Sequence, residues 1–409
     1  MVQSVRGHSM ISKLSNINTY KYAANLALFN FAYLLYLSIP KLSGNDEKIV
    51  GFASQHFNGN IKYLYEEMNQ NYNNVKLYFV TENSAELERL TEENVDAYHC
   101  RDIRKIPLFV KTNVWVTSHG PFYIPEYYLF SLSKKHKSKW VDLWHAVEAL
   151  DGTSDGRVKM LKDYDIGIIP SDFFMQHYLS KDETLSGKLK LTGFPRTDPL
   201  VDNRFDRQKI MRHMRIPQKN KNILYATTWG KPAAGEKNKP FFPFENDEII
   251  IRDIDEFCMK KNCNFIIRMH PNWERDEKET ALKLIKYIEK TNNIYYLPFN
   301  TYPITEPILY ISDLLITDHS SIGRDFALLN RPMIYLDFGI AKEKLIPELS
   351  NEIGYFSQSK EDFFYLMQKV LDNEDEYKIA RVEFIKKICK YSDGNSSQRC
   401  AEEITKLLI

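Results

Sequence analysis

Short apolar segments alternate with longer amphipathic segments over most of the chain. Apolar runs bounded by polar residues predict buried strands, and the segments between them predict helices. This alternation is typical of an α/β protein with a mainly parallel sheet. In the first half, strands are predicted at residues 49–52, 75–80, 114–117, 140–144 and 166–169, and helices at 61–69 and 82–93.

The same alternation starts again after residue 204. Two such sets in tandem predict two Rossmann-like domains facing a cleft, with the chain divided into residues 1–45, 46–204 and 205–409. In the second set, strands are predicted at residues 222–226, 265–268, 314–317 and 333–336, and helices at 205–214 and 396–408.

An apolar stretch near the amino end departs from the pattern of a soluble enzyme. Residues 22–39 contain no charged side chain, and as a helix they would span about 27 Å, the short limit for crossing a bilayer. Pro40 and Lys41 make a poor signal-peptide cleavage site, and Asn25 and Asn30 interrupt the apolar surface. A spanning helix and a buried helix of the first domain are both open alternatives. We favour an interfacial helix that docks the protein on a membrane face.

Composition narrows the function classes. The 409 residues suffice for two or three domains of about 150 residues each. Lys and Arg number 55 and Asp and Glu number 54, so the net charge of +1 provides no basic field for nucleic acid. The 5 cysteines are scattered, which argues against a disulfide framework and favours a reducing compartment.

Two histidines of the first half follow predicted strands. In open parallel sheets, ligands bind beyond the carboxyl ends of the strands, so polar residues at these positions are site candidates. His119 follows the strand at 114–117 and His145 follows the strand at 140–144. Two imidazoles at such ends would reach one cleft. The alternative is that each histidine caps a loop or satisfies a buried carbonyl group.

The second half offers an anion site at two strand ends. Arg268 and His270 lie two residues apart after an apolar run, as in an anion clamp, although a surface pair is the alternative. Ser320 and Ser321 follow the strand at 314–317 and precede a helix, and either serine is a natural N-cap. The free N–H groups of a helix start suit phosphate, while an ordinary capped helix is the alternative.

Motifs of several nucleotide-binding and metal-dependent enzymes are absent from the sequence. No GxxxxGK[ST], GxGxxG, GxSxG or HExxH occurs. The readings as a P-loop enzyme, a dinucleotide dehydrogenase, an α/β-hydrolase or a zinc protease therefore lose their main support. We expect no cofactor and no catalytic metal.

Several segments, in the same order along the chain, resemble motifs of the CDP-glycerol glycerophosphotransferase family of teichoic-acid and capsule biosynthesis. The resemblance runs from about residue 49 to the end of the sequence. The segments are GNIKYLYEEM at 59–68, LWH at 143–145, TGFPRTD at 192–198, ILYATTW at 223–229, RMHP at 268–271, ITDHSSIGRDFALLNRP at 316–332, and the DG at 393–394 with Arg399.

The resemblance implies a GT-B-like pair of Rossmann-like domains and a membrane-associated amino end. It implies transfer of glycerol phosphate, or another polyol phosphate, from a CDP-activated donor to a hydroxyl of a lipid-linked glycan or polymer acceptor, with release of CMP. The first domain would take the acceptor and the second the donor. The protein would act in cell-wall or capsule polymer synthesis as a peripheral enzyme at the cytoplasmic face of the cell membrane.

The resemblance also implies roles for individual residues. His145 matches the histidine of the family's W-H-G motif, the expected base, and Arg268 with His270 matches its phosphate-side pair. His145 and His270 are the expected catalytic residues. His119 and Glu148 are further candidates at the same cleft. Residues expected to hold the donor phosphates or nucleotide are Arg268, Arg196, Thr228, Asp318, Ser320 and Ser321.

The sequence departs from the family pattern after the catalytic histidine. Ala146 stands for the family's glycine, and Val147 to Leu150 replace its T-P-x-K, so that a lysine is lost and Glu148 is gained. Thr227 and His319 replace a proline and a tyrosine of later motifs. A GT-B glycosyltransferase using a nucleotide sugar is therefore an alternative. A non-catalytic membrane-docking or assembly protein is a third, supported only by the missing lysine.

Overall fold

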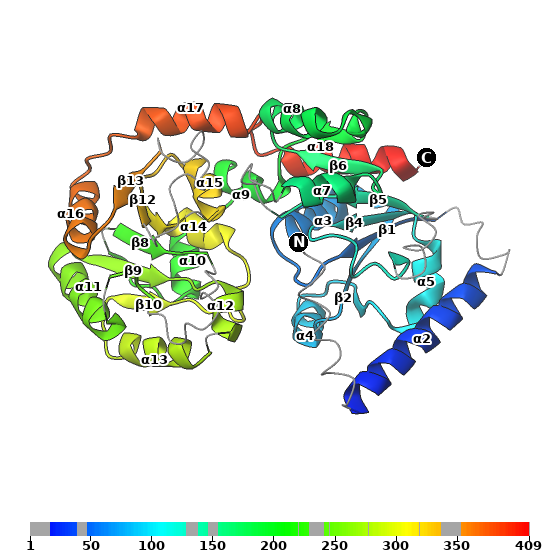
Figure 1. Ribbon diagram of the computed structural model, residues 1–409, viewed down its shortest axis with the longest axis horizontal. Coiled ribbons are helices and arrows are strands. Elements are labelled where there is room, and N and C mark those ends of the chain that lie inside the picture. Colours follow the sequence, from blue (N-terminus) through cyan, green and yellow to red (C-terminus); the bar gives the residue numbers. More distant parts are fainter. Residues whose placement is uncertain are drawn as a thin grey trace.

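The computed structural model describes residues 17–38, 47–127, 138–145, 154–219, 221–228, 241–244, 246–276, 278–318, 320–336 and 353–408. These residues form one parallel sheet of 7 strands and another of 6, each in its own lobe (Figure 1). The expected α/β fold with parallel sheets is confirmed.

The first sheet has the strand order β3-β2-β1-β4-β5-β6-β7. Its central strands are apolar and buried, as expected for parallel strands covered by helices on both faces. β3 and β7 were not predicted from the sequence because each is short, lies at an edge and is partly exposed. The strands are β1 Lys48–Ala53, β2 Val75–Thr81, β3 Ala97–His99, β4 Val114–Thr117, β5 Lys139–Asp142, β6 Ile166–Ile169 and β7 Leu189–Leu191.

The second sheet has the order β10-β9-β8-β11-β12-β13. Its four central strands agree with the predicted ones to within a few residues, and the two edge strands, of 3 residues each, were again missed. The strands are β8 Lys221–Tyr225, β9 Cys263–Ile267, β10 Ile294–Tyr296, β11 Leu314–Thr317, β12 Met333–Leu336 and β13 Tyr355–Ser357.

Helices connect the strands and cover the sheets. In the first lobe they are α3 Gly59–Asn71, α4 Ser84–Glu92, α5 Ile106–Lys111, α7 Ser154–Leu161, α8 Asp172–Lys181 and α9 Asp198–Val201, with 3-10 turns η2 Ile103–Lys105, η3 Glu183–Leu185 and η4 Pro195–Thr197. In the second lobe they are α10 Arg207–His213, α11 Asp247–Lys261, α12 Pro271–Asp276, α13 Lys278–Ile288, α14 Glu306–Ile311, α15 Ile322–Ala327 and α16 Lys360–Leu371.

The end of the chain returns to the first lobe. α17 (Lys378–Ile388) runs from the second lobe towards α8, and α18 (Ser396–Thr405), followed by the 3-10 turn η6 (Lys406–Leu408), packs against α3 (Figure 1). The two sheets lie on either side of the predicted division at residue 204, which stays a prediction, but the tail helix packs with the first sheet.

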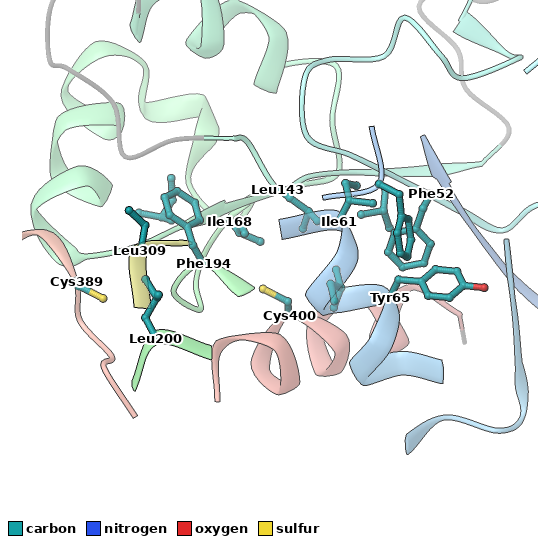
Figure 2. Packing of buried hydrophobic residues seen from close by; sticks show 14 of the residues in the cluster. Phe52, Ile61, Tyr65, Leu143, Ile168, Phe194, Leu200, Leu309, Cys389 and Cys400 are labelled. Carbon is teal, nitrogen blue, oxygen red and sulfur yellow. The ribbon is translucent and has the colours of Figure 1, made fainter. Parts of the chain in front are cut away.

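One apolar core runs through both lobes. It joins Val116 and Ile168 of the first sheet to Leu224 and Leu315 of the second. Figure 2 shows its middle, where Leu309 of α14 lies near Phe194, Leu200 and Cys389. All five cysteines are buried and free.

Residues Ile17–Leu37 form helix α2, and its described side chains, from residue 24 onward, are buried on one face. Phe29 and Tyr33 are 1% and 0% exposed and pack towards α5, whereas the side chains on the other face remain in solvent. Among the helices of the described residues, none is both long and apolar enough to cross a bilayer. The large apolar residues exposed on α2 are Leu28, Phe31, Leu34 and Leu35.

Candidate active site

Three histidines follow three neighbouring strands of the first sheet. His56 follows β1, His119 follows β4 and His145 follows β5, and these strands lie side by side. Because the carboxyl ends of parallel strands meet at one edge, the imidazoles come together. The rings of His119 and His145 stack with centroids 4.4 Å apart and an angle of 13° between their planes. The structure therefore brings together the two histidines that the sequence analysis selected.

The tautomer of His145 follows from its hydrogen bond. Its Nδ1 lies 3.3 Å from the carbonyl oxygen of Ser118, which can only accept, so Nδ1 carries the proton. In the neutral ring, Nε2 is then left with a lone pair. His119 is held by the hydroxyl of the same Ser118, 2.8 Å from its Nδ1. One serine thus orients both rings.

Both imidazoles are neutral at physiological pH. Each side chain is exposed to solvent, and the protein atoms packed around the rest of each ring disfavour its charged form. Burial, followed by repulsion from His119 when that ring is protonated and by the charge of Arg196, lowers the pKa of His145 to about 3. Burial, followed by the charges of His56 and Arg196, lowers the pKa of His119 to about 4. A neutral His145 can accept a proton at Nε2.

The backbone that carries His145 is fixed from outside. Asn60 Nδ2 donates to the carbonyls of Leu143 and Trp144 over 3.1 and 2.9 Å, and Arg196 Nη1 donates to the carbonyl of His145. Three successive carbonyl groups are therefore held by two side chains. Trp144 has φ +53°. This conformation costs a bulky residue free energy and persists only where the surrounding structure imposes it.

A buried ion pair beneath the loop supports Trp144. Arg157 donates from Nε to Asp142 Oδ2 over 3.0 Å, and both side chains are almost completely buried. The guanidinium carbon of Arg157 lies 5.0 Å from the Trp144 ring, within the range of a cation–π contact. The side chain of Asp142 also accepts from the N–H of Trp144 over 3.1 Å.

Arg196 joins the two lobes. Its Nη2 lies 2.9 Å from Asp325 Oδ1 in α15, while its backbone N–H donates to Asn60 Oδ1 over 3.1 Å. Arg196 is 9% exposed and Asp325 8%. In this arrangement both terminal nitrogens of Arg196 have partners within the protein, and its predicted role at the donor stays a prediction.

The rest of the TGFPRTD segment docks the last helix. Asp198 accepts from the N–H groups of Ser396 and Ser397 over 2.9 and 2.7 Å and so caps α18. Gly193 has φ +82°, and a Cβ atom there would lie 2.4 Å from the hydroxyl of Ser396. Glycine and aspartate are thus needed where the chain end meets the first lobe.

On the second lobe, Arg268 is a buried cation, and one of its terminal nitrogens makes no hydrogen bond among the described residues. It is 5% exposed; Nη1 donates to the carbonyl of Leu297 over 3.0 Å, and Nη2 has no hydrogen-bond partner among the described residues. Its guanidinium carbon lies 5.1 Å from the ring of Phe299, and burial lowers its pKa to about 10. A buried guanidinium with an unused N–H group favours an anion nearby.

Phe299 also contacts the first lobe. The His56 ring meets it edge to face at 4.8 Å, so the phenyl ring separates His56 from Arg268. His56 Nδ1 lies 3.9 Å from the carboxylate of Glu86. The histidine edge of the first sheet and the arginine of the second are therefore one phenyl ring apart.

His270 begins α12. Its Nδ1 accepts from the N–H of Asn272 over 3.1 Å, and its carbonyl accepts from Trp273 and Glu274. The neutral ring therefore carries its proton on Nε2, which can donate to an anion. The bond to Asn272 gives Nδ1 a structural role at the start of the helix. The contact between Nε2 and phosphate stays a prediction.

Asp318 ties two loops of the second lobe together. Its carboxylate accepts from the N–H and hydroxyl of Thr228 and from the N–H of Ser320 over 3.0 Å. Ser320 Oγ accepts weakly from Ile322 N–H at 3.5 Å, and Ser321 makes no side-chain cap. Capping therefore does not explain Ser321, while Asp318 orders the loop in which both serines lie.

Some predicted features lie outside the described residues. Glu148 is one of them, as are Ala146 and His319. Among the residues that the structure does describe, no group of three or more His, Cys, Asp or Glu side chains is placed to hold a metal ion.

Sequence reasoning missed four residues of this region. His56 could have been found, because it follows the predicted strand at 49–52 just as His119 and His145 follow theirs. Asn60 and Asp325 stand within recognised motif segments, but nothing in a sequence shows which loop an amide or carboxylate will reach. Phe299 has no sequence signal beyond its position after a short edge strand.

Two parallel Rossmann-like sheets, meeting at their histidine and arginine ends and joined by a returning terminal helix, define the GT-B-like class. Solved structures agree. The wall teichoic acid polymerase TagF superposes with a TM-score of 0.70 over 95% of this chain and 97% of that chain, at 20% identity. At this identity the likeness shows the fold alone.

The chain belongs to the CDP-glycerol:poly(glycerophosphate) glycerophosphotransferase family, whose model matches residues 35–406. Membership of this family makes it an enzyme, as expected from the sequence. It is 24% identical over 92% of its length to the teichoic acid ribitol-phosphate polymerase TarK of Staphylococcus aureus and 26% identical over 86% to the teichoic acid glycerol-phosphate primase of Bacillus subtilis. It covers 71% of the former and 90% of the latter, but 59% of a poly(ribitol-phosphate) polymerase of Bacillus spizizenii.

Proposed function

We propose that this enzyme transfers glycerol phosphate, or another polyol phosphate, from a CDP-activated donor to a hydroxyl of a membrane-linked glycan or polymer, and releases CMP. The observation that carries the proposal is the Arg196 bridge. A single guanidinium contacts the carbonyl of His145 and the carboxylate of Asp325, which belongs to the helix after Ser320 and Ser321. The expected base thus lies within one side chain of the expected phosphate loop.

The reaction forms one bond and breaks one. The acceptor oxygen attacks the phosphorus that carries the polyol, and the bond from this phosphorus to the bridging oxygen breaks. CMP leaves with the electron pair. The hydroxyl proton passes to Nε2 of His145, whose lone pair is available because Nδ1 is engaged with Ser118.

His145 needs its pKa raised before it is an effective base. In the ligand-free protein burial and the neighbouring cations lower that pKa to about 3. A diphosphate bound nearby brings negative charge that favours the imidazolium and so raises the pKa. The donor itself therefore activates the base, and free enzyme holds a weakly basic ring.

The transferred phosphate lies on the second lobe in this proposal. Phosphoryl transfer depends mainly on positioning and on stabilising negative charge. The unused Nη2 of Arg268 and the Nε2–H of His270 can donate to phosphate oxygens, and the loop of Ser320 and Ser321, ordered by Asp318, would hold the remaining phosphate. The second domain, from residue 205, then binds the donor and the first, from residue 46, binds the acceptor.

An assay of several donors identifies which polyol the enzyme transfers. The relatives include both ribitol-phosphate and glycerol-phosphate enzymes, and a TagF variant has been solved after a soak with CDPG. The purified protein should be incubated with CDP-glycerol, CDP-ribitol, UDP-sugars and GDP-sugars while the released nucleotide is measured. Release of CMP from a CDP-polyol alone is expected, whereas release of UDP or GDP would identify a glycosyltransferase and overturn the proposal.

We place the enzyme at the cytoplasmic face of the cell membrane through α2. Leu28, Phe31, Leu34 and Leu35 recur at helical spacing on the solvent face of α2, and each is at least 50% exposed. The opposite face is anchored to the first lobe by Phe29 and Tyr33 in the core beside α5. A bilayer surface is the occupant that suits such a stripe, because each buried leucine contributes about 1.5–3 kcal/mol.

A further inference from the structure

Arg196 is hydrogen-bonded to three groups on three different segments of the protein. Its backbone N–H donates to Asn60 Oδ1, its Nη1 to the carbonyl of His145 and its Nη2 to Asp325 over 2.9 Å. The side chain is nearly buried, and its Cδ lies against Gly59, 3.9 Å from where a Cβ would stand. Nε of Arg196 is buried and has no hydrogen-bond partner among the described residues, while both terminal nitrogens are engaged in the bridge.

The bridge connects elements far apart in the sequence. His145 lies after β5 of the first sheet, and Asp325 lies in α15, which follows β11 of the second. Asn60, at the start of α3, completes the set by holding the two carbonyls before His145. The orientation of one loop is therefore set by α3, by η4 and, through Arg196, by the other lobe.

The bridge is not explained by stability alone. Removing two charged groups from water costs several kcal/mol for each ion, and their attraction often only offsets that cost. Asp325 is buried, and burial raises its pKa although Arg196 opposes the rise. An apolar contact of similar size would stabilise the lobe interface equally. We therefore relate the charge pair to the geometry that it imposes on His145.

The loop needs such a constraint because Trp144 holds a left-handed conformation at φ +53°. Without external bonds the backbone would relax towards ordinary φ values and turn the imidazole of the next residue. A displacement of about 1 Å at a reacting group can cost about 10²-fold in rate.

We infer that Arg196 is a positioning residue: by bridging the His145 carbonyl and Asp325, it sets the orientation of the His145 imidazole when the two lobes are in contact. This inference rests on the proposed function of His145 as the base. It replaces a direct phosphate contact by Arg196 with an indirect role in the chemical step.

The test uses two conservative variants of the full chain. Arg196→Lys keeps the positive charge but replaces the planar fork with a point charge that cannot make both bonds. Asp325→Asn keeps an acceptor oxygen and removes the negative charge. The matched controls are Arg104→Lys and Asp102→Asn, an arginine–aspartate pair in which Arg104 is 86% exposed. For each protein, kcat and KM for CDP-glycerol are measured by CMP release, CDP affinity by calorimetry and folding by circular dichroism.

A positioning role predicts a selective loss in kcat. Arg196→Lys and Asp325→Asn should each lower kcat by about 10²-fold while KM and CDP affinity stay within about threefold. The double variant should be no worse than the single ones, because both substitutions act on the same bridge. The Arg104→Lys and Asp102→Asn controls should behave like the parental enzyme.

Other outcomes overturn the inference. A tenfold loss of CDP affinity in Arg196→Lys with kcat unchanged would make Arg196 a phosphate ligand, and parental kcat in Asp325→Asn would remove the bridge from catalysis. If Arg196→Lys does not fold, Asp325→Asn alone decides. Absence of CMP release from every CDP-polyol by the parental enzyme would instead overturn the proposed function, so the two failures are distinguishable.

Discussion

The imidazole of His119 lies flat against that of His145, with ring centroids 4.4 Å apart. Protonation of either ring would place a cation against its neighbour, so each ring opposes the protonation of the other. The pair therefore keeps His145 neutral over the physiological pH range. It also makes the basicity of His145 sensitive to whatever charge is brought to this edge of the sheet.

The first prediction concerns the base. His145→Ala should lower kcat by about 10²–10⁴-fold, since the variant lacks the group assigned to take the acceptor proton. The side chain keeps exposed surface, so the fold should be retained. CMP release under saturating donor measures the loss, with His213→Ala, an exposed histidine at the end of α10, as the control. Near-parental turnover in a folded His145→Ala protein would show that the base lies elsewhere.

The second prediction concerns pH. The base must be neutral to act, so activity is lost as pH falls through its pKa. In the free enzyme the pKa of His145 is about 3, so kcat/KM should remain flat down to strongly acidic pH. The anionic donor raises the pKa in the complex, and the acid limb of kcat should therefore lie at higher pH than that of kcat/KM.

Initial rates from about pH 4 to about pH 9 check this order of the two limbs. His119→Asn removes a neighbour that opposes protonation and should move the kcat limb further upward. Coincident limbs in the parental enzyme would mean that donor binding leaves His145 unaffected.

The third prediction separates binding from stability at Arg268. Arg268→Met should weaken CDP-glycerol binding by about tenfold or more, because a charge-assisted hydrogen bond contributes about 1.5–3 kcal/mol. The unfolding temperature of the ligand-free variant should be no lower than that of the parental protein. The lost bond to the Leu297 carbonyl is offset by relief of a buried cation whose pKa burial lowers to about 10.

Calorimetry with CDP-glycerol and thermal unfolding with and without it give both quantities. At equal concentration the donor should raise the unfolding temperature of the parental protein more than that of Arg268→Met. Unchanged affinity in the variant would exclude Arg268 from the phosphate site.

The fourth prediction concerns α2. Replacing Phe31 and Leu34 together by aspartate should lower binding to anionic phospholipid vesicles by about tenfold or more, because two large apolar contacts with the bilayer are lost. Both residues are at least half exposed, so the fold should be unchanged. Co-sedimentation with vesicles provides the measurement. The control is Ile379→Asp on α17, where the isoleucine is 80% exposed, and equal loss in both variants would contradict docking through α2.

The fifth prediction concerns Glu306 at the lobe interface. Its carboxylate accepts from the hydroxyl of Tyr63 over 3.4 Å, and burial raises its pKa from 4.5 to about 7. A raised carboxyl pKa means that the unfolded chain releases the proton first, so stability falls as pH rises from about 4.5 to about 7 and stays reduced above that.

Glu306→Gln removes this penalty. The variant should therefore exceed the parental protein in unfolding free energy by up to about 3 kcal/mol above neutral pH, and the difference should shrink in acid. Urea unfolding at several pH values checks the trend. A difference that does not depend on pH would mean that Glu306 titrates alike in the folded and unfolded chain.

The central strands could be predicted from sequence because each is a short apolar run that must be buried on both faces. β4, β6, β11 and β12 begin and end close to the predicted limits. Edge strands such as β3 lack this signal, since only one side of the strand is paired and their residues are partly exposed. The return of α18 to α3 is a long-range contact that no local pattern encodes.

The site was predictable where strand ends alone decide it. His119 and His145 meet because β4 and β5 are neighbours, and the rule extends to His56 after β1. The sequence does not show which groups each polar side chain will choose as hydrogen-bond partners. Arg196 and Asp318 stand in motif segments that suggest ligand binding, yet in the structure their hydrogen bonds hold loops of the protein to one another.

The capping of α18 by Asp198 has a consequence for biosynthesis. The N–H groups of Ser396 and Ser397 donate to the carboxylate of Asp198, which is synthesised about half a chain length earlier. Cys400 and Ile404 of α18 pack into the core beside α3. A nascent chain emerging from the ribosome must therefore carry an unfinished first lobe until α18 has been synthesised. Chains that lack α18 would expose the apolar surface that this helix covers, and we expect chaperones and proteases to bind them.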